Sequence, residues 1–219
     1  MVKCLSCKSN STIKFGKSAS GTQLFRCKKC KRIFREKYTY KSWLVSDEQI
    51  IRYVKRGVGI RGMADLLEIS PTTVITRIKL IAKKIKQPSP MPFGKEYEID
   101  EMSSFIRHKK KRVWITYALE KQSKKVVDFV VGSRSKKTMS KVTNTVSLSN
   151  PKQVFTDKYP VYLKLLPEEI HTVRRRCTNY IERKNLSLRT HLKRLNRKTI
   201  CYSKSISMLT ACLTIYFWG

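Results

Sequence analysis

The chain has 219 residues, with 48 Lys and Arg against 15 Asp and Glu, which gives a formal net charge of +33 at pH 7. Hydrophobic residues make up 41% of it, a share typical of a globular protein and too high for a disordered one. So large a basic excess predicts a polyanionic partner, most often nucleic acid. The alternatives are a basic surface that serves only solubility and an association with ribosomes.

The two ends of the chain give no sign of export or of a membrane span. The start, "MVKCLSCKSN", has no apolar core of a signal peptide. The end, "ISMLTACLTIYFWG", is shorter than the about 20 residues that a span needs, so we expect a buried terminal helix and no membrane partner. The expected location is the cytoplasm, where seven cysteines indicate metal ligands or free thiols rather than disulfides.

Residues 1–40 contain two CxxC pairs, and the pairs are separated by a segment that alternates like a β-hairpin. Two such pairs bring four thiolates to one ion, the arrangement of a zinc ribbon, and the ion would stabilise a segment too small for a core of its own. A redox-active CxxC is the alternative, but it does not explain two pairs. The predicted zinc ligands are Cys4, Cys7, Cys27 and Cys30.

Residues 44–87 are expected to form three helices. The first begins after Ser46, a favourable N-cap, and the third has Pro71 in its first turn. A short helix, a tight turn and a longer basic helix predict a helix-turn-helix with recognition helix 71–86, and a plain three-helix bundle is the alternative. Val74, Ile78, Ile81 and Ile85 share one face of that helix, and the residues expected to meet DNA are Thr72, Thr73, Thr76 and Arg77.

The Pro- and Gly-containing run "QPSPMPFGK" predicts a linker over residues 88–95. After it, the β-branched and aromatic runs "YEIDEM", "RVWITYALE", "KVVDFVV", "QVFTD" and "IHTVRRR" predict strands. Helices are expected at "KKTMSKVTNTVSL", "YPVYLKLL" and "TNYIERKNLSLRTHLKRL". This order predicts a mixed α/β domain over residues 96–219.

Three carboxylates occupy matching places in this second half. Asp100 lies in the first strand, Asp157 follows the fourth, and Glu182 lies early in the helix after the fifth. Three acids that meet in a basic protein would repel one another unless cations joined them, and hard oxygen ligands suit Mg²⁺ or Mn²⁺. The alternatives are that Glu101 is a better ligand than Asp100, that Asp157 caps a helix, and that Glu182 pairs with surface lysines and arginines. No partner pattern singles out Asp128, another strand acid.

Three stretches resemble the InsA/InsB-type transposases of very small bacterial insertion sequences, and the resemblance covers nearly the whole chain. They are "IDE" from Ile99, "TDKYPVY" from Thr156 and above all "NYIERKNLSLRTHLKRLNRKTICYSKS" from Asn179. The resemblance implies an RNase H-like fold with an Asp-Asp-Glu triad, which falls on Asp100, Asp157 and Glu182, with 24 residues between the last two. It also implies metal-dependent cleavage at the element's ends and direct attack of the freed 3′-hydroxyls on target DNA.

Basic residues around the triad are expected to follow the DNA backbone, and bringing two element ends together implies a homo-oligomer. Arg189 or His191 would approach the scissile phosphate, although a lone histidine on a helix is more often structural. Two rival functions stay open: a non-enzymatic DNA-binding regulator and a nuclease that cuts without joining. The backbone-contacting residues expected here are Arg174, Arg175, Arg176, Arg183, Lys184 and Arg189.

Overall fold

The computed structural model describes residues 2–36, 45–88, 93–173 and 177–219. The chain forms two compact units, Met1–Trp43 and Leu44–Gly219. In the part of the chain that is described, no helix is long and apolar enough to cross a membrane.

The first unit is a three-stranded antiparallel sheet with the order β1-β2-β3. Its strands are β1 (Thr12–Lys17), β2 (Gln23–Cys27) and β3 (Ile33–Arg35). The predicted hairpin is therefore confirmed, and β3 is an additional short strand after the second CxxC pair. Among its described residues, 2–36, the buried core consists of Cys4, Cys27 and Phe34. A core this small does not hold a fold without a further staple.

The second unit begins with three helices, α1 (Asp47–Lys55), α2 (Ile60–Leu67) and α3 (Pro71–Lys84), as predicted. Ser46 caps α1 in a capping box with Gln49. Ser70 caps α3, and Pro71 occupies its first turn. The predicted apolar face of α3 is buried except at Ile85, which ends the helix and is only partly covered.

A five-stranded mixed sheet follows, with the order β6-β5-β4-β7-β8. Strands β4, β5 and β6 pair antiparallel, whereas β7 lies parallel to β4 and β8 parallel to β7. The predicted mixed α/β class is thus confirmed. The strands are β4 (Glu96–Ile106), β5 (His108–Glu120), β6 (Val126–Gly132), β7 (Gln153–Phe155) and β8 (His171–Thr172).

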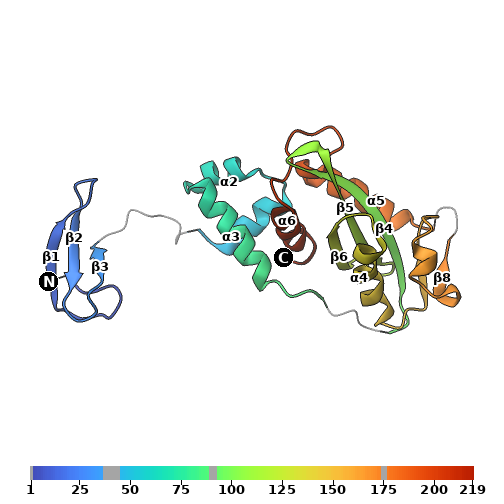
Figure 1. Ribbon diagram of the computed structural model, residues 1–219, viewed down its shortest axis with the longest axis horizontal. Coiled ribbons are helices and arrows are strands. Elements are labelled where there is room, and N and C mark those ends of the chain that lie inside the picture. Colours follow the sequence, from blue (N-terminus) through green and yellow to red (C-terminus); the bar gives the residue numbers. More distant parts are fainter. Residues whose placement is uncertain (1, 37–44, 89–92, 174–176) are drawn as a thin grey trace. The chain divides into compact units, whose positions relative to one another are not determined.

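Helices cover both faces of this sheet (Figure 1). The helix α4 (Lys136–Ser147) packs on one face through Met139, Val142 and Val146. The helices α5 (Asn179–His191) and α6 (Ile206–Trp218) pack on the other. Four apolar residues of α5 and the segment after it are buried against that face: Ile181, Leu188, Leu192 and Leu195.

Two predicted elements are shorter than expected. The segment "YPVYLKLL" was expected to be helical, but it forms only the 3₁₀ turn η2 (Tyr162–Lys164). Pro160 and Pro167 bound six residues, too few to repay the cost of starting an α-helix. The predicted long basic helix ends at His191, because the backbone of Leu192 is extended. The rest of the predicted segment forms the separate 3₁₀ turn η4 (Lys193–Leu195).

The strands around Asp157 are also shorter than the sequence suggested. The strand β7 ends at Phe155, before Asp157, and β8 has two residues. The predicted DNA contacts Arg174, Arg175 and Arg176 lie outside the described residues.

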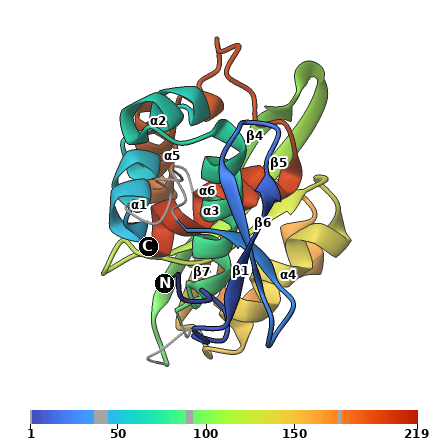
Figure 2. The same ribbon diagram turned by 90° about the vertical axis from the view of Figure 1, so that its left-hand side faces the viewer.

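The terminal helix α6 is buried, as predicted, and it belongs to two cores at once (Figure 2). Met208, Ala211, Cys212 and Ile215 pack with α1, α2 and α3. Leu209 and Leu213 pack with α5 and the sheet. The three N-terminal helices and the sheet are therefore joined within one unit by the last helix of the chain.

Candidate active site

The pairing of β7 with β4 sets Asp100 beside Asp157. Glu98 of β4 is the register partner of Phe155, the last residue of β7. Because the two strands are parallel, Asp100 and Asp157, each two residues further along, come to lie at the same level. One oxygen each from Asp100, Glu101 and Asp157 lies within 4.8 Å of the others. Asp157 is also a turn residue, since its Oδ1 accepts a hydrogen bond from the backbone N–H of Tyr159 (3.0 Å). Asp157 therefore closes a turn in addition to lying in the carboxylate cluster, and it does not cap an α-helix.

Glu182 reaches the same place from α5. Together with Asp100 and Glu101 it lines a pocket of about 760 Å³. It is not one of the three clustered carboxylates but lies beside them, exposed, with its Oε1 accepting from the Thr178 hydroxyl (3.2 Å). The structure thus brings the three predicted acids to one region and adds Glu101 to them.

A buried hydrogen-bond chain fixes Asp100. Asn185, on α5, donates from Nδ2 to Asp100 Oδ2 over 2.7 Å. The Tyr117 hydroxyl, on β5, lies 2.9 Å from Asn185 Oδ1 and 3.2 Å from the carbonyl oxygen of Ile181. The sequence reasoning missed Asn185, although it lies three residues after Glu182 and so on the same side of the helix.

A second buried acid fixes the start of α5. Glu98 is 1% exposed and lies two residues before Asp100, on the same face of β4. Its Oε2 accepts from the backbone N–H of Ile181 (2.7 Å) in the first turn of α5. Burial raises the pKa of Glu98, and this hydrogen bond opposes the rise. A carboxylate at a helix N-terminus is favourable, so Glu98 helps to hold the helix that carries Glu182.

The electrostatics of the cluster favour a cation. Burial raises the pKa of Asp100, and repulsion from Asp157 and Glu182 raises it further. Hydrogen bonds from the backbone of Glu101 and from Asn185 oppose this rise. Burial raises the pKa of Glu101 to about 7, with Arg134 opposing the rise and Asp157 and Asp100 adding to it. Both oxygens of Glu101 are buried without a hydrogen-bond partner. This set of oxygen donors fits Mg²⁺ or Mn²⁺.

Arg134, which the sequence did not single out, contacts two of the clustered carboxylates. Its Nη2 lies 3.5 Å from Glu101 Oε2 and 3.9 Å from Asp157 Oδ2. Its guanidinium stands over the rings of Tyr159 (3.7 Å) and Trp114 (4.6 Å). These contacts hold a positive charge at the edge of the carboxylates.

The predicted basic residues fall into two groups. Arg189 lines the acidic pocket together with Arg197, and its Nε is buried without a hydrogen-bond partner. Arg183 and Lys184 line a neighbouring groove that includes Glu98 and also reaches Glu182. His191 lies outside both groups, because its Nδ1 is 2.6 Å from the Tyr216 hydroxyl of α6.

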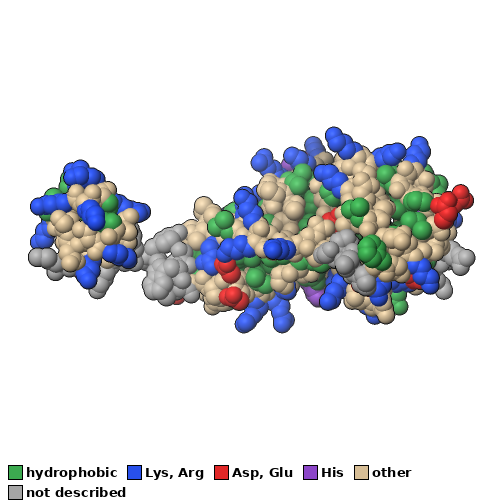
Figure 3. Space-filling view, turned by 90° about the horizontal axis from the view of Figure 1, so that it is seen from below, with side chains coloured by type: hydrophobic (Ala, Val, Ile, Leu, Met, Phe, Trp, Pro, Cys, Tyr) green, Lys and Arg blue, Asp and Glu red, His purple; other side chains and the backbone are tan. Residues whose placement is uncertain are grey.

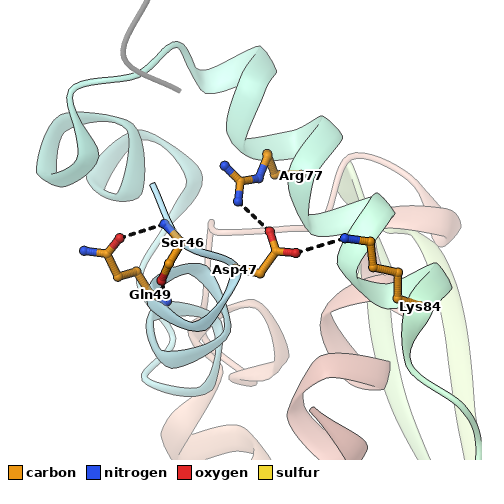
Figure 4. Close-up of polar contacts among 5 residues, drawn as sticks. All are labelled: Ser46, Asp47, Gln49, Arg77 and Lys84. Atoms are coloured by element: carbon orange, nitrogen blue, oxygen red, sulfur yellow. Dashed lines mark hydrogen bonds and ion pairs between the residues drawn. The ribbon is translucent and has the colours of Figure 1, made fainter. Parts of the chain in front are cut away.

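On α3, Thr72 and Thr76 are exposed. The Thr73 hydroxyl lies 2.8 Å from that of the N-cap Ser70. Arg77 pairs with Asp47 of α1, which also accepts from Lys84 (3.1 Å), so Arg77 ties the two helices together (Figure 4). A role for these residues at DNA stays a prediction.

The first unit carries a second candidate metal site. One sulfur from each of Cys4, Cys7, Cys27 and Cys30 lies within 4.8 Å of the others. The Sγ atoms of Cys4 and Cys30 are 3.6 Å apart, and those of Cys7 and Cys27 are 3.5 Å apart. The backbone N–H of Cys7 lowers the pKa of the Cys4 thiol to about 6, which favours the thiolate that binds metal. The donor set fits a tetrahedral zinc site.

A mixed α/β sheet with a carboxylate pocket at its edge, in a chain this basic, is typical of transposases and related DNA-processing proteins. The sequence model of the IS1 transposase matches residues 96–217. The chain belongs to the IS1 transposase family.

The relatives that it matches are InsB proteins. It is 35% identical over 111 residues to the InsB protein of insertion element IS1 from Shigella sonnei, which covers 51% of this chain and 85% of that one. It is equally identical to InsB of insertion element IS1 4 from Escherichia coli K12, where the match spans 66% of the relative. A chain in a cryoEM structure of the simian T-cell lymphotropic virus intasome with the PP2A subunit B56 gamma superposes with a TM-score of 0.38 and 15% identity, covering 77% of this chain and 68% of that one.

Proposed function

We propose that this protein is a DNA transposase that cleaves the ends of its insertion sequence and joins the freed 3′-hydroxyls to target DNA. The observation that carries the proposal is the register of β4 and β7, which sets Asp100 beside Asp157 at a pocket that Glu182 also lines. We assign these three residues as the catalytic carboxylates.

Each neighbouring residue has a defined task in this scheme. Asp100, Asp157 and Glu182 hold a divalent cation, and Glu101 lies close enough to add a fourth carboxylate. When bound there, Mg²⁺ or Mn²⁺ supplies the charge that polarises a phosphate oxygen and activates the attacking water or hydroxyl.

Two further kinds of side chain support the carboxylates. Asn185 orients the carboxylate of Asp100 by donating a hydrogen bond to its Oδ2. Arg189 and Arg197 face the acids from the same pocket and hold the phosphate that is cut.

The proposed organisation places a zinc ribbon at residues 1–40, a helix-turn-helix at 44–87, a linker at 88–95 and an RNase H-like catalytic domain at 96–219. The cysteine cluster supports the first assignment, and the three helices, of which α1 and α3 are capped, support the second. The mixed sheet with helices on both faces supports the last. Thr72 and Thr76, near the start of α3, are the best placed of the predicted residues to meet base edges.

The proposed partner is double-stranded DNA, both at the element's ends and at the target. Lys and Arg side chains spread over the viewed face of each unit, with acids in few places (Figure 3). Neutralising phosphates with such a surface supplies affinity that does not depend on sequence. Because two ends must be joined to one target, we propose a homo-oligomer that acts on DNA in the cytoplasm.

A strand-transfer assay tests the proposal. Purified protein, Mg²⁺, linear DNA carrying the element's ends and a plasmid target should give joined products. Asp157→Asn should abolish cleavage while leaving DNA binding nearly intact, because it removes a metal ligand from a partly exposed position. Asp128→Asn is the matched control, since Asp128 lies in β6 and bonds Thr145 of α4 rather than lining the pocket.

The outcomes separate the rival functions. Joined products support the transposase, nicks without joining support a nuclease, and binding without cleavage supports a regulator. Full cleavage by Asp157→Asn would remove that residue from the site.

A further inference from the structure

The turn between β4 and β5 gathers five lysines and arginines within the six residues 107–112. Arg107 alone connects the strands, with Ile106 paired to His108 and Phe105 paired to Arg112. Between those two pairs, residues 109–111 bulge out of the ladder, and all three are lysines. Every residue from 107 to 112 is exposed. The bulge therefore presents three ammonium groups that the sheet does not use.

A loop from the far end of the chain braces this turn. The backbone N–H of Arg107 donates to the carbonyl of Ser203 (2.9 Å), and its Nε donates to the carbonyl of Lys204 (3.1 Å). The Phe105 and Tyr202 rings meet edge to face with centroids 6.1 Å apart. In Figure 1 the green hairpin and the red loop lie against each other. We call residues 107–112 and 196–204 together the hairpin platform.

The charge on the hairpin platform is not compensated. No Asp or Glu occurs in residues 102–119 or 183–219. Among the ion pairs seen in the described ranges, none involves a residue of the platform. Its basic side chains are Arg107, Lys109, Lys110, Lys111, Arg112, Arg197, Lys198 and Lys204.

The hairpin platform is continuous with the acidic pocket. Asn196 and Arg197 belong to the platform loop, and both line the pocket that contains Asp100 and Glu182. Burial lowers the pKa of the Arg189 guanidinium, and the nearby charge of Arg197 lowers it further. Two arginines held near each other in one pocket favour a polyanion that passes between the carboxylates and the hairpin.

We propose that the hairpin platform binds the sugar-phosphate backbone of duplex DNA next to the carboxylate pocket, through residues other than the α3 threonines expected to meet base edges. Its loop also lines a pocket with Pro71, Ile75 and Lys79 of α3, so the two surfaces adjoin. This inference rests on the proposed function, because it extends the DNA path from the cleaved bond. A bulge of lysines with no base-reading aromatic or amide side chain among them contacts phosphates and carries no sequence preference.

The test compares two triple variants of the full chain with equal loss of charge. The first variant removes the three charges of the bulge: Lys109→Ala/Lys110→Ala/Lys111→Ala. The second removes three exposed lysines of α4, which packs on the face of the sheet opposite to α5: Lys136→Ala/Lys137→Ala/Lys141→Ala. Binding of a duplex of arbitrary sequence is measured by fluorescence anisotropy over a range of salt concentrations. If each lysine contacts one phosphate, the slope of log K against log salt, which is negative, should become smaller in magnitude by about 2–3 in the bulge variant. The α4 variant should change it by less than half as much.

Each result decides the matter. A bulge variant with the wild-type slope, or an equal fall in both variants, overturns the platform. Circular dichroism should show both variants folded, since the substituted side chains are exposed. Failure of the proposed function would look different: the wild-type protein would bind duplex but give no cleavage in the strand-transfer assay, whatever the bulge variant does.

Discussion

The hydrogen bond from Asn185 to Asp100 gives a sharp test of how the pocket is ordered. Asn185 is 8% exposed and joins Asp100 to the Tyr117 hydroxyl. In Asn185→Ala, Asp100 Oδ2 loses its donor, whereas the Tyr117 hydroxyl retains the carbonyl of Ile181 as an acceptor. The loss therefore falls on the carboxylate and not on the fold.

The expected magnitudes follow from that asymmetry. Removing a partner that orients a metal ligand typically weakens metal binding by about 10–100-fold, and we expect that loss of Mg²⁺ affinity in Asn185→Ala. Its free energy of unfolding should change by only about 1 kcal/mol, since one hydrogen bond to a solvent-reached carboxylate is lost. Tyr117→Phe should show the reverse, because it leaves the buried Asn185 Oδ1 without a donor at a cost of about 1–3 kcal/mol while the bond to Asp100 persists.

Two measurements check this pair of variants. Mg²⁺ binding by isothermal titration calorimetry reports the pocket without requiring activity, and urea unfolding without metal reports the fold. Thr145→Val is the control, because it removes a hydrogen bond to the partly buried Asp128 away from the pocket. It should lower stability without changing Mg²⁺ affinity. Wild-type Mg²⁺ affinity in Asn185→Ala would refute the view that Asn185 positions Asp100.

Three further predictions concern the rest of the molecule. Cys27→Ser, or a chelator with the wild type, should remove zinc and unfold the first unit while the second unit stays folded; unchanged zinc content by mass spectrometry would contradict the ribbon. Burial raises the pKa of Asp128, so the folded protein keeps a proton that the unfolded chain releases, and stability should fall as pH rises from near 3.8 through that raised pKa. Asp128→Asn should make this fall smaller in urea titrations, since Glu98, Asp100 and Glu101 also have raised pKa values and keep their share of it, whereas parallel pH profiles would exclude a contribution of Asp128. Leu213→Ala should cost about 2–5 kcal/mol by thermal or urea unfolding, since Leu213 is fully buried, and a cost below about 1 kcal/mol would show that the site collapses.

Local signals in the sequence were sufficient for the three N-terminal helices and for the metal candidates. Ser46 and Pro71 marked helix starts because capping depends on a few neighbouring residues. The spacing of the cysteines predicted a cluster because two short loops fix where four thiols point. Asp157 was singled out because it lies close behind a buried strand, two residues after the end of the three-residue strand β7.

What the sequence did not reveal depends on contacts between distant segments. Arg134 lies 33 residues from Glu101 and reaches it only because α4 starts at the edge of the sheet. Asn185 acquires its role from Tyr117, on a strand under the helix. The bulge at Lys109–Lys111 exists because Ile106 pairs with His108 while Phe105 pairs with Arg112, which no alternation of residues predicts. In each case the chemistry of the side chain was visible, but its partner was not.

The terminal helix explains how the three N-terminal helices and a carboxylate pocket share one folded unit. A helix that packs on a single face carries one apolar stripe, but α6 carries two, because Met208 and Cys212 face the helical core while Leu209 and Leu213 face the sheet. Its burial therefore stabilises both cores together. Displacing α6 would expose the interior of each, so the three N-terminal helices cannot separate from the sheet at low cost. On the proposed function, a DNA end bound by α3 is thereby held at a fixed place relative to Asp100, which a flexible linker over residues 88–95 would not achieve on its own.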